Sequence, residues 1–257
     1  SLLELPASRD GKLEARRISL RLALSRSDNA AAERLLSEVG ADGVVGWAHA
    51  SGIESRLEPT PSLALGAYEV TPLEAANSYA TFASGGQFAA PVLVTKVVGP
   101  DGKELVLPAP PPARRVMNED EAYLLTSLLS SVVKEGTATR ALSLARPLAG
   151  KTGTTNEAKD AWFIGYSTDL VCAVWVGFDD ALALGWGESG ATTALPGWIE
   201  LMKNAHDKKP ATDFPRPPSL ISARIDPASG LLARSDQEDG RDELFLEGTV
   251  PNEVADG

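Results

Sequence analysis

Residues 148–177 read LAGKTGTTNEAKDAWFIGYSTDLVCAVWVG and decide the fold class. They contain three runs of strand-forming residues, 148–155, 161–167 and 170–177, joined by short turns. The second and third runs are apolar at successive positions rather than at alternate ones, which is typical of strands covered on both faces. We therefore predict that these two runs are central strands of a sheet that lies between helical layers.

Helical signals lie on both sides of this segment. Apolar residues recur at helical spacing between Ile18 and Val39, and the cap-forming residues 25–29 interrupt them, which predicts two helices with a tight joint. Thr71 and Asn118, each with a glutamate three residues later, predict helices over 72–83 and 119–135. Two further helices are expected over 44–50 and 196–206, and a β-hairpin with strands 91–98 and 104–107.

The composition changes after the last predicted helix. Residues 208–218 are polar and rich in proline, which predicts a linker, and the remainder carries weak strand signals. We expect an α+β domain over 1–207, built from an antiparallel sheet flanked by helices and an all-helical subdomain. A C-terminal β-type extension is expected over 219–257.

The composition excludes several classes of function. The 257 residues include 24 basic and 35 acidic side chains, and the formal charge of −11 disfavours binding of nucleic acid, which needs a basic face. The single cysteine, Cys172, cannot form an internal disulfide, and His49 and His206 are too far apart for a local metal-ligand pair. We predict no metal and no cofactor. No apolar run is long enough to span a membrane, and no signal peptide is recognisable.

The string at 149–156, AGKTGTTN, is compatible with two chemistries. A phosphate-binding loop of an NTPase requires a glycine five residues before Gly-Lys-Thr, but Ala145 stands there. Pro147 removes a backbone donor, and a predicted strand rather than a helix follows. The alternative is a lysine, hydroxyl and glycine triplet on a strand that lines an acyl-transfer cleft, as in serine enzymes that recognise penicillin. A second element of those enzymes, Ser-x-Asn, stands upstream as Ser27-Asp28-Asn29.

These motifs and their surroundings closely resemble bifunctional (class A) penicillin-binding proteins. The resemblance extends from about residue 18 to residue 251 and is carried by segments that match in order: 63–67, 69–73, 79–83, 149–156, 159–166, 174–177 and 225–230. It implies a β-lactamase/transpeptidase-like fold and a serine D,D-transpeptidase that cross-links peptidoglycan stem peptides and is acylated by β-lactam antibiotics. It also implies a place on the periplasmic face of the inner membrane, with a membrane anchor that these residues do not contain.

The resemblance also assigns catalytic roles. Ser27 would relay a proton toward the leaving amine, and Asn29 would hydrogen-bond the amide of the substrate. Lys151 would keep the cleft positive and orient Ser27. The backbone N–H of Thr154 would form half of the oxyanion hole.

The same strand would bind the substrate. The hydroxyls of Thr152 and Thr154 would hold its terminal carboxylate, and Gly153 would let the substrate backbone approach closely. Thr155, next along the strand, completes the predicted substrate-binding set.

The nucleophile of the family is the chief departure. Its Ser-x-x-Lys motif should precede Ser-x-Asn by several dozen residues, but only 26 residues precede Ser27 and none of the serines among them fits. Ser131 and Lys134 match the spacing, but they lie after Asn29 within a predicted helix, so we interpret this match as chance. We expect the nucleophile in an N-terminal segment that is missing here. The alternatives are a catalytically inactive penicillin-binding-like domain, and a D,D-carboxypeptidase or serine β-lactamase.

Other conspicuous residues are expected to serve structure. The tryptophans at 162, 175, 186 and 198 are predicted to be core or cleft-wall residues. Cys172 is expected to be buried and inert. His49 and His206 are expected at the surface or at helix ends, and Asp160 in a turn.

Overall fold

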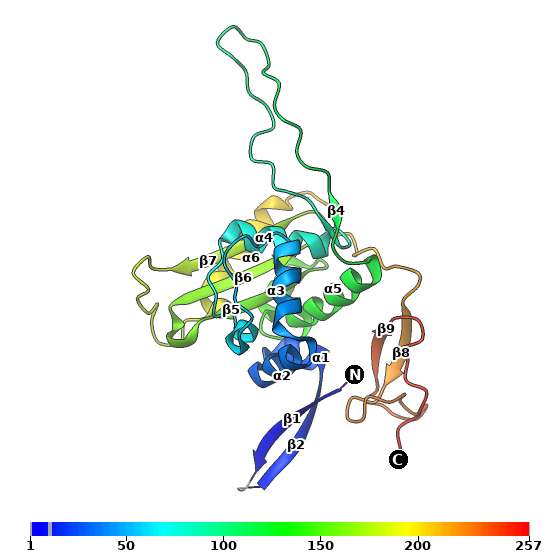
Figure 1. The fold of residues 1–257 in the computed structure, drawn as a ribbon. Helices are drawn as coiled ribbons and strands as arrows, with labels where there is room; N and C mark the ends of the chain where they lie inside the picture. Colours follow the sequence, from blue (N-terminus) through cyan, green and yellow to red (C-terminus); the bar gives the residue numbers. More distant parts are fainter. Residues whose placement is uncertain (1, 10–11, 257) are drawn as a thin grey trace.

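The computed structural model of the chain describes residues 2–9 and 12–256 (Figure 1). A three-stranded antiparallel sheet, in the order β5-β6-β7, contains the three predicted strand runs. Its strands are β5 (Ala149–Thr154), β6 (Asp160–Tyr166) and β7 (Val171–Gly177). The expectation of a central strand is confirmed for β6. It is wrong for β7, which is an edge of the described sheet and leaves the Trp175 side chain 37% exposed.

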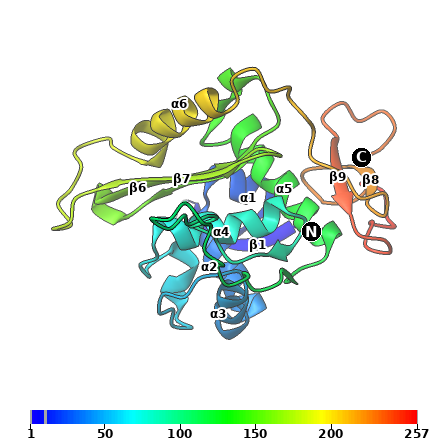
Figure 2. The ribbon, with the colours of Figure 1, turned by 90° about the horizontal axis from the view of Figure 1, so that it is seen from above.

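Helices cover both faces of the sheet (Figure 2). The helix α6 (Leu195–Ala205) lies on one face, where the Trp198 and Phe163 rings meet edge to face with centroids 4.8 Å apart. The helices α4 (Pro72–Ala83) and α5 (Glu119–Lys134) lie on the other face. There Tyr166 is fully buried and packs with residues of both helices. The predicted layering of helices around an antiparallel sheet is therefore confirmed.

The predicted joint between two helices is present. The helix α1 (Leu20–Arg26) ends at Ser27, and α2 (Asn29–Val39) begins after Asp28, whose carboxylate accepts a hydrogen bond from the Ala31 N–H at 3.0 Å. The next helix, α3 (Ala41–Ala50), starts three residues earlier than expected. Short 3₁₀ segments η1 (Pro61–Leu65), η2 (Thr139–Leu144) and η3 (Asn156–Ala158) and a π-helical turn η4 (Gly190–Ala194) complete the helical elements.

Two hairpin regions differ from expectation. The first residues form an unpredicted antiparallel hairpin, β1 (Leu2–Arg9) and β2 (Lys12–Ser19), whose buried residues Leu3, Leu5 and Ile18 pack against α1 and α2. The predicted hairpin strands 91–98 and 104–107 do not form. The chain makes a single bridge between Val98 and Glu104 on an arm that projects from the body, between β3 (Gln87–Phe88) and β4 (Arg114–Arg115) (Figure 1).

Missing packing explains the arm. Its apolar side chains are open to solvent, and that of Val106 is 99% exposed. A two-stranded ribbon without a third strand or a helix beneath it is marginally stable in water. The apolar residues of the arm therefore have no surface to pack against, and the predicted strands do not form.

The C-terminal residues form a small antiparallel unit beside α5 (Figures 1 and 2). Its strands are β8 (Ile221–Ile225) and β9 (Arg241–Phe245). The preceding stretch 208–218 contains neither helix nor strand, but the Phe214 ring packs on the Tyr166 ring with centroids 5.6 Å apart. The proposed boundaries at 207 and 219 stay predictions.

The aromatic and titratable residues divide into core and surface. Trp198 is fully buried, whereas Trp186 is fully exposed in a loop, so its predicted place in the core or cleft wall is wrong. Cys172 is buried as expected, and burial raises the pKa of its thiol. His206 caps the end of α6 and makes a hydrogen bond with the Ser167 hydroxyl at 2.8 Å. Asp160 begins β6 rather than occupying the turn itself.

Two features are absent from the described residues, 2–9 and 12–256. In this part of the chain, no helix combines the length and the apolar character that crossing a membrane requires. Nor do three or more histidine, cysteine, aspartate or glutamate side chains come together there as a group able to hold a metal ion.

Glu74 offers a direct test of the predicted capping box. Its carboxylate accepts hydrogen bonds from the N–H and hydroxyl of Thr71, from the N–H and hydroxyl of Ser55 and from the Glu54 N–H, at 2.6–2.8 Å. Burial alone would raise the pKa of Glu74, but these donors outweigh it and lower the pKa to about 2. We expect Glu74→Gln to lower the free energy of unfolding at pH 7 by about 2 kcal/mol in urea titrations.

The pH dependence follows from the lowered pKa. The stabilisation is complete above the ordinary value of 4.5 and is lost as the pH falls through about 2. The stability difference between Glu74→Gln and the unmodified protein should therefore shrink over that range. Glu69→Gln, an exposed change just before the cap, is the control. A pH-independent difference, or an equal loss in the control, would contradict the role of the carboxylate.

Candidate active site

The two predicted motifs meet across one contact. The Lys151 Nζ donates a hydrogen bond to the Ser27 Oγ at 2.7 Å, although the two residues are 124 positions apart in sequence. Lys151 lies on β5, and Ser27 lies at the end of α1. The structure thus places the helical lobe and the first strand of the sheet on two sides of one site.

Local backbone geometry places Ser27. It is the C-cap of α1 and adopts the left-handed conformation, with φ 56° and ψ 48°. Asp28 is the N-cap of α2 and pairs with Arg16 at 2.6 Å. Burial would raise the pKa of the Asp28 carboxyl, but the Arg16 guanidinium and the Ala31 N–H lower it below its usual value. The anionic Asp28 therefore fixes the joint on which Ser27 stands.

Asn29 is the first residue of α2 and is exposed. Within the described residues its side-chain amide makes no hydrogen bond. It is therefore free to bind a ligand, and its contact with the substrate remains a prediction.

Lys151 is the charged centre of the site. Its ammonium donates a second hydrogen bond to the Thr152 backbone oxygen at 2.9 Å. Both acceptors are neutral, and burial lowers the pKa of Lys151 to about 8. Within the described part of the chain no carboxylate pairs with this ammonium. A partly desolvated ammonium of this kind favours an anionic ligand.

Thr152 faces a residue that the sequence did not single out. Its hydroxyl makes a hydrogen bond of 2.7 Å with the hydroxyl of Thr137, which follows α5. The Thr137 N–H donates to the Ser25 carbonyl oxygen of α1 at 3.2 Å. Gly136 permits this approach, because a Cβ there would lie 2.4 Å from the same oxygen.

Thr154 is exposed near the end of β5. Its hydroxyl oxygen accepts a hydrogen bond from the Gly190 N–H at 2.9 Å, so its own hydrogen remains able to donate to a ligand. A Cβ at Gly190 would lie 2.3 Å from the Trp162 carbonyl oxygen, so only glycine allows this contact.

Thr155 has a structural role. Its hydroxyl accepts hydrogen bonds from the backbone N–H groups of Lys159 at 3.1 Å and Asp160 at 2.8 Å, which closes the turn between β5 and β6. Gly153, two residues earlier, packs closely against its partner Trp162 on β6. A Cβ at Gly153 would lie 3.1 Å from the Trp162 Cβ. The predicted substrate contacts of both residues remain predictions.

Ser131 lies outside this site. It is a buried residue of α5, and its Oγ accepts a hydrogen bond from the Arg21 Nη1 at 2.6 Å and donates to the Ser127 carbonyl oxygen at 3.3 Å. Lys134 is exposed. The geometry agrees with the interpretation of this Ser-x-x-Lys spacing as chance.

Comparison with known families identifies the family and the fold. The model of the "Penicillin binding protein transpeptidase domain" matches residues 8–194, and that of the "Penicillin-binding protein 1A, C-terminal domain" matches residues 216–257. This chain belongs to the penicillin-binding protein transpeptidase family. The resemblance stated from the sequence motifs is thereby confirmed.

Individual relatives agree with the family match. Penicillin-binding protein 1A of Aquifex aeolicus is 40% identical over 96% of this chain, and that of Pseudomonas aeruginosa is 34% identical over 92%. The chain spans about a third of the length of these curated relatives (34% and 35%).

Solved structures agree as well. The crystal structure of penicillin-binding protein 1A from Haemophilus influenzae superposes with a TM-score of 0.85 at 31% identity, over 99% of this chain and 45% of that one. PonA1 from Mycobacterium tuberculosis, solved in complex with penicillin V, superposes with a TM-score of 0.71 at 25% identity, over 83% of this chain and 66% of that one.

Three residues of the candidate site carry no motif signal in the sequence. Thr137, Gly136 and Gly190 hold β5 in place, but none of them belongs to a recognisable motif. Glycines that permit backbone contact between distant segments leave no periodic signal in a single sequence.

The lowered pKa of Lys151 can be measured directly. We expect its side-chain ¹³Cε resonance to titrate with a midpoint near pH 8, because burial disfavours the ammonium. NMR titration of the 257-residue chain measures this midpoint, and Lys151→Met identifies the resonance by its loss. A midpoint at the ordinary value of 10.5 would show that the ammonium is fully hydrated.

Proposed function

We propose that this chain is the later part of a serine D,D-transpeptidase domain of a peptidoglycan synthase. The reaction would be acyl transfer from a stem peptide that ends in D-Ala-D-Ala to the amine of a second stem peptide. The contact of 2.7 Å between Lys151 and Ser27 carries the proposal, because it joins the two family motifs in one site. The family match over residues 8–194 supports it.

The proposed reaction has two steps. A serine oxygen attacks the carbonyl carbon of the penultimate D-alanine, an ester forms, the C–N bond breaks, and D-alanine leaves as the protonated amine. The amine of the second peptide then attacks the ester, an amide forms, and the serine recovers its proton. We assign this serine and its lysine base to a segment outside the 257 residues. Within these residues only Ser131 has a lysine three positions later, and it is buried in α5, outside the candidate site.

Ser27, Lys151 and Asn29 would serve proton transfer and orientation. Ser27 accepts a hydrogen bond from the Lys151 ammonium, which leaves its hydroxyl hydrogen available for the leaving amine. The ammonium would stabilise the anionic carboxylate of the substrate and keep Ser27 oriented. Asn29, exposed at the start of α2, would bind the amide of the stem peptide.

The strand β5 would hold the substrate. Thr154 would donate its hydroxyl hydrogen to the terminal carboxylate, and its N–H would donate to the oxyanion, an interaction that contributes about 3 kcal/mol in comparable sites. Thr152, oriented by Thr137, would supply the second hydroxyl. Gly153 would permit close approach of the substrate backbone. Thr155 would support these contacts through its turn.

The proposed ligands and location follow from the same assignment. A β-lactam antibiotic carries a carboxylate and a reactive amide, so it would occupy the same contacts and acylate the same serine. The protein would act at the periplasmic face of the bacterial inner membrane, and its membrane anchor would lie in another part of the protein.

Covalent labelling tests the proposal. A longer form of the protein that includes the upstream segment with Ser-x-x-Lys should form an adduct with a fluorescent penicillin, seen on gels and as one added mass by intact mass spectrometry. Absence of an adduct in the folded longer form would favour an inactive binding domain. Rapid release of hydrolysed penicillin would instead favour a β-lactamase.

In the same longer form, Lys151→Ala should reduce the labelling rate at least a hundredfold without unfolding the domain, because it removes the positive charge of the site. Circular dichroism checks folding. Lys159→Ala, which removes a lysine paired with Glu157 outside the site, is the matched control and should label normally. Equal labelling of both variants would remove Lys151 from the mechanism.

The 257-residue chain alone should not be acylated. Ser131 is buried and its oxygen is already an acceptor for Arg21, so it cannot act as a nucleophile. Incubation with excess fluorescent penicillin followed by peptide mass mapping checks this expectation. An adduct on the peptide that contains Ser131 would overturn it.

A further inference from the structure

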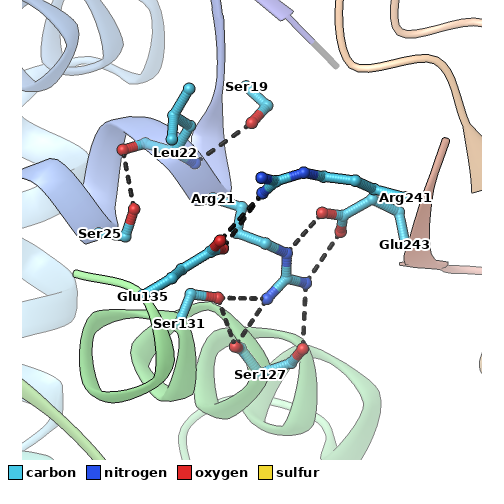
Figure 3. A network of polar contacts seen from close by, with 9 residues as sticks. All are labelled: Ser19, Arg21, Leu22, Ser25, Ser127, Ser131, Glu135, Arg241 and Glu243. Atoms are coloured by element: carbon cyan, nitrogen blue, oxygen red, sulfur yellow. Dashed lines mark hydrogen bonds and ion pairs between the residues drawn. The ribbon is translucent and has the colours of Figure 1, made fainter. Parts of the chain in front are cut away.

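A network of charged and polar side chains joins the C-terminal unit to α1 and α5 (Figure 3). The Arg21 guanidinium contacts the Glu243 carboxylate through its Nε at 2.5 Å and its Nη2 at 2.8 Å. It also donates to the Ser127 carbonyl oxygen at 2.8 Å, the Ser127 hydroxyl at 3.1 Å and the Ser131 hydroxyl at 2.6 Å. All five N–H donors of Arg21 are therefore used, and its side chain is only 15% exposed.

A second ion pair lies two residues away on the same strand. Arg241 of β9 contacts Glu135, the C-cap of α5, at 3.1 Å (Figure 3). Side chains two positions apart point to the same face of a strand, so Arg241 and Glu243 both face the transpeptidase domain. In one pair β9 contributes the carboxylate, Glu243, and in the other it contributes the guanidinium, Arg241. This opposite polarity disfavours a shift of β9 along the domain.

The first pair is linked to Ser27. The helix α1 has seven residues, with Arg21 in its first turn and Ser27 as its C-cap. A helix moves as a rigid body over so short a length. The position of the Arg21 guanidinium therefore limits where the Ser27 hydroxyl can lie.

The second pair is linked to Thr152. Two residues after Glu135, Thr137 donates its N–H to the Ser25 carbonyl oxygen and shares a hydrogen bond with the Thr152 hydroxyl. Gly136 between them leaves room for this approach. The same short segment thus connects the end of α5 to both α1 and β5.

Apolar packing between the unit and the domain is incomplete beside the network. A cavity of about 500 Å³ lies there, with Leu20 and Leu128 on one side and Phe245 on the other. The two ion pairs are the polar contacts that join β9 to the domain beside this cavity.

We propose that Glu243 and Arg241 are positioning residues of the candidate active site. By holding α1 and the end of α5, they set the distance between Ser27 and β5. The catalytic consequence rests on the proposed function, whereas the positioning itself does not. Ser131 gains a role that its Ser-x-x-Lys spacing concealed, as a fixed acceptor for Arg21.

NMR spectroscopy of the 257-residue chain tests the positioning. Glu243→Gln and Arg241→Ala should shift the backbone amide resonances of Ser27 and Thr152. Both changes should also raise the titration midpoint of Lys151 by at least half a pH unit, because a displaced Ser27 lets water reach the ammonium. Asp242→Asn, an exposed change between them on β9, is the matched control and should alter neither.

A charge exchange distinguishes positioning from general loss of stability. Glu135→Arg and Arg241→Glu should each shift the same resonances, and the double variant should restore them, because the pair is re-formed with reversed polarity. Both side chains are partly solvent-exposed, so these variants should fold. Thermal unfolding followed by circular dichroism checks this.

Two outcomes would overturn the proposal. In one, the β9 variants release the C-terminal unit, seen as faster proteolysis near residues 208–218, while Ser27, Thr152 and Lys151 are unchanged. In the other, neither the unit nor the site responds. In the longer form, Glu243→Gln should slow acylation by penicillin about tenfold relative to Asp242→Asn. A longer form that is never acylated would refute the proposed function and leave the NMR result to decide the positioning.

Discussion

The Lys151 ammonium is held by two neutral oxygens, those of Ser27 and the Thr152 backbone, and by no carboxylate among the residues that the structure describes. This arrangement costs solvation, as the lowered pKa of Lys151 shows. The surrounding structure compensates by fixing the acceptors: Asp28 anchors the joint that carries Ser27, and the β5-β6 pairing fixes the strand that carries the lysine. A ligand carboxylate would supply the missing negative charge, so we expect the site to prefer anions.

Close backbone contacts help to hold the segments that surround the Lys151 ammonium. Gly136 and Gly190 each allow an approach that a Cβ would block, and through them α1, α5, β5 and β6 come together around Lys151. Thr137 and the Gly190 N–H then hold the hydroxyls of Thr152 and Thr154. The threonines are thus oriented before a ligand arrives, which reduces the entropy lost on binding.

The C-terminal unit takes part in the same architecture. Its strand β9 reaches the domain through two ion pairs, one at the start of α1 and one at the end of α5. Both helices end at the site. This small β unit is therefore connected through α1 and α5 to the residues that would bind and orient the substrate.

The sequence by itself determined the elements with strong local signals. The caps at Thr71 and Asn118, the joint at residues 25–29 and the three strands around Lys151 were predicted correctly, because capping and β-type runs depend on near neighbours. The order of the motifs also identified the family.

Tertiary structure alone decided the rest. The apolar residues around Val98 read as strands but found nothing to pack against, and Trp186 lies in solvent. Ser131 matched a catalytic spacing but faces Arg21. The contacts of Thr137 with Thr152 and of Arg21 with Glu243 join segments that are far apart in sequence. Such contacts depend on how the elements pack, and no spacing within a single sequence encodes them.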